Sequence, residues 1–203
     1  MMNRFLRVIF LIFLTLHLSS CGASFKKRHF KHDLQKLNQK NYQLLDGTYS
    51  VNPKSVYYSK SKNFFSDSIF RKMNTYNLFV NEPIKFSKLD TIEFINSNKK
   101  FALRFISSEQ IEIIYLINDV IKSREIINGK IKRNGLFYLD NKYFESKGIP
   151  YLWGGIDVKK RRIGLSKSGN LIFNGAYSRE GALLFLFAAG TSYNTVYEIE
   201  KIN

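Results

Sequence analysis

After Pro83 the chain alternates between apolar and polar residues with a period of two. In the stretch 100–105, Lys-Phe-Ala-Leu-Arg-Phe, every second residue is large and apolar. Further along, Ile121, Ile127 and Ile131 fall on one face of the same pattern, and basic residues fall on the other. Strands of an antiparallel sheet that bury one face and expose the other give this pattern. The sequence therefore predicts a mainly antiparallel, all-β fold.

Short turn sequences separate the alternating stretches. Asn134-Gly135, Ser168-Gly169 and Glu180-Gly181 are typical of tight connections between neighbouring strands. Parallel strands need crossover connections of about a dozen residues or more, and no helical pattern lies between these strands. We predict a single meander β-barrel of about 8–10 strands, because closing the sheet removes its two unpaired edges.

Three segments depart from the simple alternation. Residues 63–73 have phenylalanine, isoleucine and methionine at helical spacing, which predicts a short helix after a first strand at 47–51. Leucines in 33–45 predict a second short helix with Asp33 near its start. Residues 182–189 form a predicted strand that is apolar on both faces. Either a helix covers its outer face, or that face is a contact patch for a partner or the bilayer.

The first 20 residues have the zones of an export signal. Arg4 and Arg7 give a positive start, and an apolar run follows. A helix that crosses the hydrocarbon core needs about 20 apolar residues, whereas the run from Phe5 to Leu18 has fourteen residues and includes a charge. We interpret residues 1–20 as a secretory signal peptide. The alternative is an uncleaved N-terminal anchor.

The end of this leader, Leu18-Ser19-Ser20-Cys21, resembles the lipobox of bacterial lipoproteins. The resemblance implies that the sulfur of Cys21 receives a diacylglycerol and that the chain is cut before this residue. Two or more acyl chains hold a protein durably to a membrane, whereas a single chain does so only marginally. Gly22, rather than aspartate, follows the cysteine. By the enterobacterial rule, this implies a lipid-anchored protein of the bacterial cell envelope, in the outer membrane and facing the periplasm.

The chain then divides into three predicted parts. Residues 1–20 are the signal peptide, residues 21–45 are the lipidated cysteine and a basic tether, and residues 46–203 are the β-barrel domain. The first half of the tether is basic with two interleaved phenylalanines. Each Lys or Arg near an anionic membrane contributes about 1 kcal/mol to binding. The alternative is a solvated linker.

The order of the predicted elements also resembles the lipocalin and fatty-acid-binding barrels. The domain opens with Gly47-Thr48-Tyr49, continues with a short helix and a meander, and ends with Tyr197-Glu198-Ile199. Those families begin near a Gly-x-Trp, and Tyr49 stands here in the place of the tryptophan. The resemblance implies a barrel that holds an apolar or amphiphilic small molecule in its interior.

Side chains needed for several chemistries are missing from the predicted domain. From Asp46 onward the sequence has no histidine and no cysteine. This excludes Ser-His and Cys-His nucleophilic catalysis, and metal sites built from histidine or cysteine, within the domain. Carboxylate pairs for glycoside cleavage stay open, because a sequence gives no spatial pairing. We expect a non-enzymatic protein without a cofactor or a metal site.

Basic residues outnumber acidic ones, with 32 Lys and Arg against 16 Asp and Glu. For an exported protein, this charge predicts contact with anionic lipid or lipopolysaccharide and no contact with nucleic acid. The densest run is Lys159-Lys160-Arg161-Arg162. Because only Asp157 is near enough in sequence to neutralise it, we predict that all four residues are exposed, with a strand beginning near Arg162. The run is a candidate anion contact; the alternative is a solvated hairpin end.

Two functions therefore stay open. In the first, the barrel of an envelope lipoprotein binds an apolar or amphiphilic molecule, since barrels of this size have room inside. In the second, the interior is packed, and the basic surface contacts anionic lipid, lipopolysaccharide or a protein partner. Lipid that co-purifies with the domain would favour the first.

Replacing the cysteine of the lipobox tests the predicted anchor. We expect that Cys21→Ser prevents lipidation and leaves the leader attached, because the lipid is joined through the sulfur. The measurement is incorporation of radiolabelled palmitate, with chain size compared on a gel. Equal labelling of the parent and the variant would contradict the anchor.

Overall fold

The protein folds as one antiparallel arrangement of strands. The computed structural model describes residues 23–25, 33–58, 63–66, 74–80, 98–149, 153–183 and 187–202. The signal peptide and Cys21 lie outside these residues. The elements are β1 (Leu34–Gln35), η2 (Tyr42–Leu45), β2 (Gly47–Tyr58), β3 (Asn63–Ser66), η3 (Thr75–Leu78), β4 (Lys99–Ser107), β5 (Gln110–Ile117), β6 (Val120–Ile131), β7 (Phe137–Ile149), β8 (Trp153–Ser166), β9 (Leu171–Leu183) and β10 (Phe187–Lys201). Among the described residues, the only helical segments are the two 3-10 turns, so the all-β prediction is confirmed.

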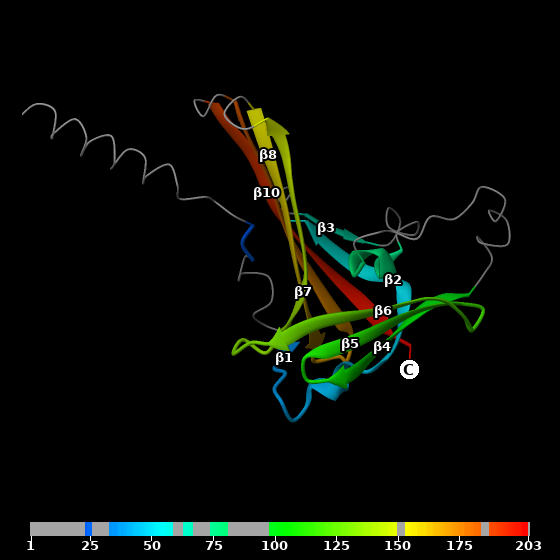
Figure 1. Cartoon of the computed structure of the whole chain (residues 1–203). Coiled ribbons are helices and arrows are strands. Elements are labelled where there is room, and N and C mark those ends of the chain that lie inside the picture. The colour runs from blue at the N-terminus through cyan, green and yellow to red at the C-terminus, as the bar shows by residue number, and fades with distance from the viewer. Residues whose placement is uncertain are drawn as a thin grey trace, which may run out of the picture.

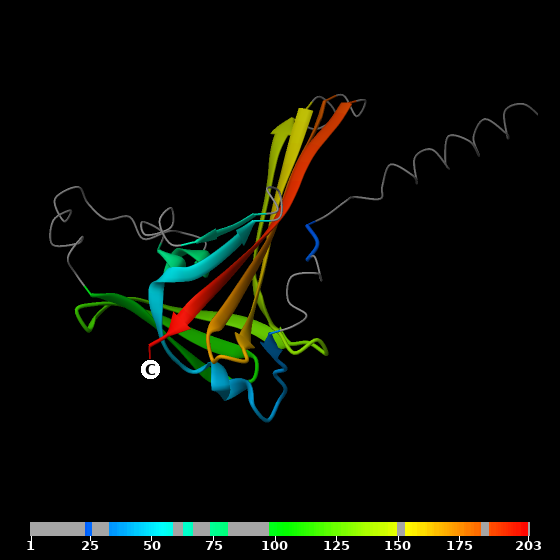
Figure 2. The same cartoon turned by 180° about the vertical axis from the view of Figure 1, so that it is seen from behind.

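The strands form a barrel-like ring (Figures 1 and 2). The pairing runs from β4 through β5, β6, β7, β8, β9 and β10 to β2, and β2 pairs in turn with β4. Each neighbouring pair is antiparallel, which confirms the predicted meander. The first strand, β2, closes the ring because its residues 47–50 pair with β4 and its residues 53–58 pair with β10. Two short strands lie off the ring: β1 pairs with β8, and β3 pairs with β2.

Aromatic and aliphatic side chains fill the inside of this ring. Alternate residues of the strands supply most of them, as the period-two pattern predicts. The segment around η3 adds Tyr76 and Phe79, both fully buried. The ring of Phe79 lies 5.4 Å from that of Phe101 and 5.0 Å from that of Phe173, so it bridges opposite sides of the core. Around Phe79, side chains of the protein therefore fill the interior of the ring.

The helix predicted over residues 63–73 is wrong in its described part. Residues 63–66 form β3, which pairs with residues 55–58 of β2; residues 67–73 lie outside the described part of the chain. A short apolar run fits either periodicity, and here the free edge of β2 provides backbone partners for a strand. Among the described residues that follow β2, the helical segment is the 3-10 turn η3, which begins at Thr75.

The helix predicted over residues 33–45 is also wrong. The start of this segment pairs with β8 as β1, and its end forms η2. Between them, the side-chain oxygens of Asn41 and Asn38 accept the backbone N–H groups of Asn38 and Lys40, at 2.6 and 2.7 Å. Such local bonds compete with helical ones. Leu37 and Leu45 enter the core, so packed structure begins before Asp46, within the predicted tether.

Strands β7 to β10 continue beyond the ring as a projecting arm (Figure 1). They have 13, 14, 13 and 15 residues, whereas β4 and β5 have 9 and 8. We define the arm as residues 143–149, 153–159, 177–183 and 187–193. The turn predicted at Glu180-Gly181 is wrong, because both residues pair within β9, and the predicted strand 182–189 falls across the ends of β9 and β10.

Tyr49 provides a test of the packed core. It is fully buried, and its hydroxyl donates to the Leu45 carbonyl at 2.7 Å. We expect Tyr49→Phe to lower the free energy of unfolding by about 1 kcal/mol at pH 8, the contribution of one hydrogen bond. Urea titrations of the parent and the variant measure this difference.

The same variant has a pH signature. Burial, with a smaller effect of the Asp46 charge, raises the pKa of Tyr49. The folded parent therefore keeps this proton at a pH where the unfolded chain loses it, and stability falls as the pH rises above about 10. The Tyr49→Phe variant has no hydroxyl to titrate at this position, so its stability does not fall for this reason. The stability difference between parent and variant should therefore shrink between pH 8 and pH 11. A difference that grows over this range would contradict the assignment.

Candidate functional site

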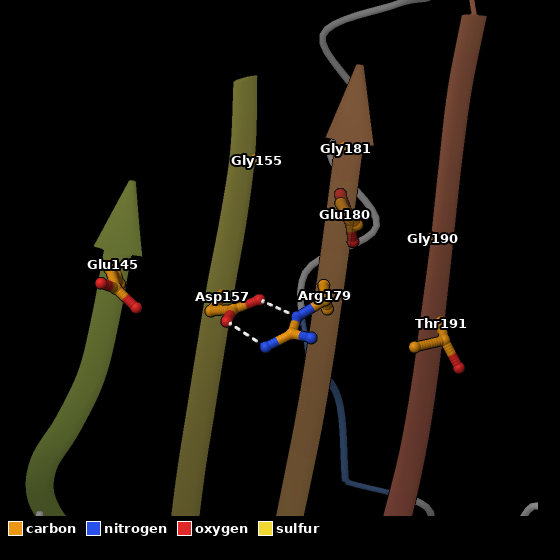
Figure 3. Close-up of a pocket in the computed structure, with 8 residues that line it drawn as sticks. All are labelled: Glu145, Gly155, Asp157, Arg179, Glu180, Gly181, Gly190 and Thr191. Atoms are coloured by element: carbon orange, nitrogen blue, oxygen red, sulfur yellow. Dashed lines mark hydrogen bonds and ion pairs between the residues drawn. The ribbon is translucent and has the colours of Figure 1, made fainter. Parts of the chain in front are cut away.

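The inner face of the arm carries an open groove of about 660 Å³ (Figure 3). We call this face inner because it continues into the core: every second residue of β9 leads from Arg179 in the arm to Phe173 in the core. The lining residues come from four adjacent strands: Glu145, Gly155, Asp157, Arg179, Glu180, Gly181, Gly190 and Thr191.

A row of polar residues crosses this groove from strand to strand. Glu145 pairs with Asp157, Asp157 with Arg179, and Arg179 with Thr191. Directly paired residues lie on the same face of a sheet, so these four side chains share the groove. The next row contains Gly155 and Gly181, which have no side chains to fill it. An added Cβ at Gly155 would meet only the Glu180 carbonyl, at 3.5 Å.

Arg179 and Asp157 form a two-pronged ion pair in the middle of the groove (Figure 3). The Arg179 Nε and Nη2 atoms donate to the two Asp157 carboxylate oxygens, each at 2.8 Å. The hydrogen bonds and charge of Asp157 raise the pKa of Arg179. The Arg179 side chain is 65% exposed, against 16% for Asp157. Arg179 therefore faces the solvent of the groove, whereas the Asp157 carboxylate beneath it is largely covered.

Tyrosines border the groove on the side of the barrel. The Tyr193 ring lies 4.7 Å from that of Tyr177 and 4.9 Å from that of Tyr58. Burial is the main cause that raises the pKa of Tyr193. Lys159 pairs with Tyr177 in the same row of the sheet and is exposed. The aromatic row thus leads from the polar groove toward the core.

The strand pairing continues to the end of the arm. Ile149 pairs with Trp153, Trp153 with Leu183, and Leu183 with Phe187. Between these pairs and the polar row, Gly155 pairs with Lys147 on one side and with Gly181 on the other.

The basic run lies in the middle of β8 rather than at its start. Lys159 is exposed and Lys160 is half-buried, but Arg161 and Arg162 are only 9% and 4% exposed. The prediction that all four are exposed, with a strand beginning near Arg162, is therefore wrong. As in any strand, successive residues alternate between the two faces, so the run forms no single cationic surface.

Neutral acceptors from distant segments make this burial possible. Arg161 donates to the carbonyls of Asn141 and Val80, at 2.9 and 3.3 Å. Arg162 donates to the Asn174 side chain at 2.7 Å and to the Tyr138 hydroxyl at 2.9 Å. Burial lowers the pKa of both arginines. These partners are distant in sequence from the run, so the search for nearby acids does not reveal them.

The groove residues were not candidates from the sequence. Gly154-Gly155, Gly181 and Gly190 are the only signal, and their placement side by side depends on strand register. Within the described part of the chain, no group of three or more histidine, cysteine, aspartate or glutamate side chains could hold a metal ion. Among those same residues, no helix has the length and apolar character needed to cross a membrane.

Comparisons with protein families, curated proteins and solved structures find no match for this chain.

The basic run yields a matched pair of variants. We expect Lys159→Gln to leave the free energy of unfolding within about 0.5 kcal/mol of the parent, as surface changes usually do. Arg162→Gln should lower it by about 2–3 kcal/mol, because bonds to a charged group are lost and buried acceptors stay unpaired. Urea titrations measure both; equal effects would contradict the assigned burial.

Proposed function

We propose that this protein is a non-enzymatic lipoprotein of the bacterial cell envelope that binds an amphiphilic molecule on the inner face of its arm. The lipobox supports a lipid anchor at Cys21, and Gly22 supports the outer membrane, facing the periplasm. The observation that carries the binding role is the groove, with its polar row between the glycines Gly155 and Gly181 and the tyrosines.

The groove suits a ligand with an apolar part and a hydroxyl-rich head. The apolar part would lie over Gly155 and Gly181, where no side chain takes up the space. In the polar row, carboxylates of Glu145 and Asp157 accept from hydroxyl groups, and Arg179 donates to oxygens. Tyr177 and Tyr193 offer ring surface to the apolar face of a sugar. We therefore propose a glycolipid-like amphiphile.

A phosphate-bearing head has less support in this groove. Glu145 and Asp157 bring two carboxylates, and the guanidinium of Arg179 is already paired with one of them. A phosphate at this place would meet like charges at short range, which disfavours binding. The head that fits is neutral and rich in hydroxyl groups.

The interior of the barrel-like ring has less support as the binding place than the arm. The lipocalin-like expectation puts a ligand inside, where aromatic rings such as Phe79 and Phe101 pack against each other. The alternative function, an anion contact through Lys159, Lys160, Arg161 and Arg162, is also weaker. Both arginines are bonded to internal acceptors, and Lys160 donates to the Ala23 carbonyl.

A variant that fills the groove tests this proposal. Gly155→Phe places a ring in the groove, and the open space at this position allows the fold to persist. Ser146→Phe is the matched control, because Ser146 is exposed on the opposite face of the neighbouring strand. The protein used is the mature chain, residues 21–203, with Cys21→Ser.

The probe is dodecyl maltoside below its micellar concentration, with dodecylphosphocholine as a probe of equal chain length and charged head. By calorimetry, we expect the parent and Ser146→Phe to bind the maltoside with similar affinity, and Gly155→Phe to bind it at least tenfold more weakly. The parent should bind the phosphocholine more weakly than the maltoside. Equal maltoside affinity in all three proteins would refute the groove as the binding place.

A further inference from the structure

The β5–β6 turn and the strand ends beside it form a tip, which we define as residues 98–100 and 116–124 (Figure 1). Asn118 and Asp119 make the turn, with φ angles of 51° and 64°. Two-residue hairpin turns of this type need a positive φ at both positions, which Asn and Asp adopt more readily than most residues. The start of β4 pairs with the end of β5. The tip is therefore a tight hairpin with a third strand beside it.

Each face of the tip carries a pair of apolar residues. On the face that continues into the core, Ile117 pairs with Val120, and on the opposite face Leu116 pairs with Ile121. Val120 is 56% exposed and Ile121 is 50% exposed. Single exposed aliphatic residues are common on protein surfaces, whereas neighbouring ones mark a contact site. Because packing of the core accounts for only one of the two faces, the tip as a whole indicates a contact outside the chain.

Basic residues lie beside the apolar pairs on both faces. On β4, Lys99 continues one apolar row and Lys100 continues the other. On β6, Lys122 and Arg124 come after the apolar residues and are exposed. The long side chains of lysine and arginine can lie along apolar groups while their charged ends stay at a polar surface. The tip thus combines an apolar end with a basic collar, formed by these four residues.

Acidic residues near the tip neutralise only part of this charge. Asp119 forms an ion pair with Lys100, and Glu112 forms one with Arg124, at 3.1 Å. Glu125 follows Arg124 on β6. These three acids stand against the four bases of the collar. The tip therefore keeps a positive charge, which attracts an anionic surface.

The polar groups of the turn are bonded within the chain. The side-chain oxygen of Asn118 accepts the Asn98 N–H at 2.9 Å, and the Asn118 N–H donates to the Asn98 carbonyl at 2.8 Å. The Asp119 carboxylate is paired with Lys100. Withdrawing a polar group from water costs much less free energy when that group already has a partner. The turn can therefore enter the headgroup region of a bilayer although Asn118 and Asp119 lie at its end.

We propose that the tip binds the surface of an anionic bilayer, with Val120 and Ile121 among the lipid headgroups and the basic collar on the lipid phosphates. Buried apolar area and attraction to anionic lipid together drive such binding. A protein partner fits this surface less well, because the centres of protein interfaces are depleted in lysine. The inference depends neither on the groove ligand nor on the proposed lipid at Cys21.

A double substitution of the exposed aliphatic residues tests the tip. Val120→Thr combined with Ile121→Thr removes apolar surface but keeps β-branched side chains, which suit a strand. The matched control is Ile106→Thr combined with Ile126→Thr. Its two residues are 53% and 58% exposed and lie outside the tip.

Binding is measured by co-sedimentation with vesicles of phosphatidylcholine mixed with phosphatidylglycerol, at low salt. The protein is the chain 21–203 with Cys21→Ser, which contains every described residue and carries no lipid of its own. We expect the control pair to bind within about twofold of the parent, and the tip pair to bind at least about fivefold more weakly, because less apolar area is buried. Circular dichroism confirms that each variant is folded.

The basic collar is tested by removing one charge. Within the described part of the chain, Lys122 has no ion pair. Lys122→Gln should weaken binding at least about threefold. Lys130→Gln, the control, removes an exposed lysine from the same strand outside the tip and should leave binding unchanged. Added salt should weaken the binding of the parent, because it screens exposed charges.

Vesicles of phosphatidylcholine alone separate charge from apolar contact, and we expect the parent to bind them far more weakly than the anionic vesicles. A parent that does not bind anionic vesicles would overturn the inference. A tip pair that binds them as tightly as the control pair would overturn it as well, since another surface then makes the contact. Equal binding to both kinds of vesicle would refute the role of the basic collar.

Discussion

Unequal strand length is the constraint on which the rest of this structure depends. A ring of antiparallel strands satisfies the backbone hydrogen bonds of both edges only over the length that all strands share. Here β4 and β5 have 9 and 8 residues, whereas β8 and β10 have 14 and 15. The surplus of β7 to β10 therefore leaves the ring as a four-stranded sheet, and this arm has two faces outside the packed core.

The two faces of the arm have different residues because of strict alternation along each strand. On the inner face, Asp157 and Arg179 lie in an open groove, next to positions where glycine leaves space. On the outer face, just past the base of the arm, Lys160 and Asn194 bond to the carbonyls of Ala23 and Ser24. Ligand binding is thus proposed for one side of these strands, and the contacts of residues 23–25 lie on the other side, so either can be altered without the other.

Neutral groups accept hydrogen bonds from the two buried arginines of β8. The chain has an excess of positive charge, yet its densest basic run does not form a cationic surface. Arg161 and Arg162 go to opposite sides of β8, where carbonyls, an amide and a tyrosine hydroxyl accept their hydrogen bonds. Arg162 also supports Phe25, so a buried arginine connects the sheet to the segment that follows the proposed anchor.

The sequence by itself determined the all-β class, the antiparallel meander and most of the core. Those features follow from period-two alternation, which each strand carries locally, as in residues 100–105. It also determined what the domain lacks, since an absent histidine or cysteine needs no structure to establish. It failed at residues 63–66, where a short apolar run fits a helix as well as a strand, and the free edge of β2 decided between them.

Which residues form the candidate site was determined only by the tertiary structure. Glu145, Asp157, Arg179 and Thr191 are far apart in sequence, and a register shift of one residue would place any of them on the other face. Likewise, no local pattern shows that Arg162 has Asn174 and Tyr138 as partners, or that residues 23–25 dock on β8 and β10. Local sequence carries periodicity, but which residues meet across strands depends on the pairing of the whole ring.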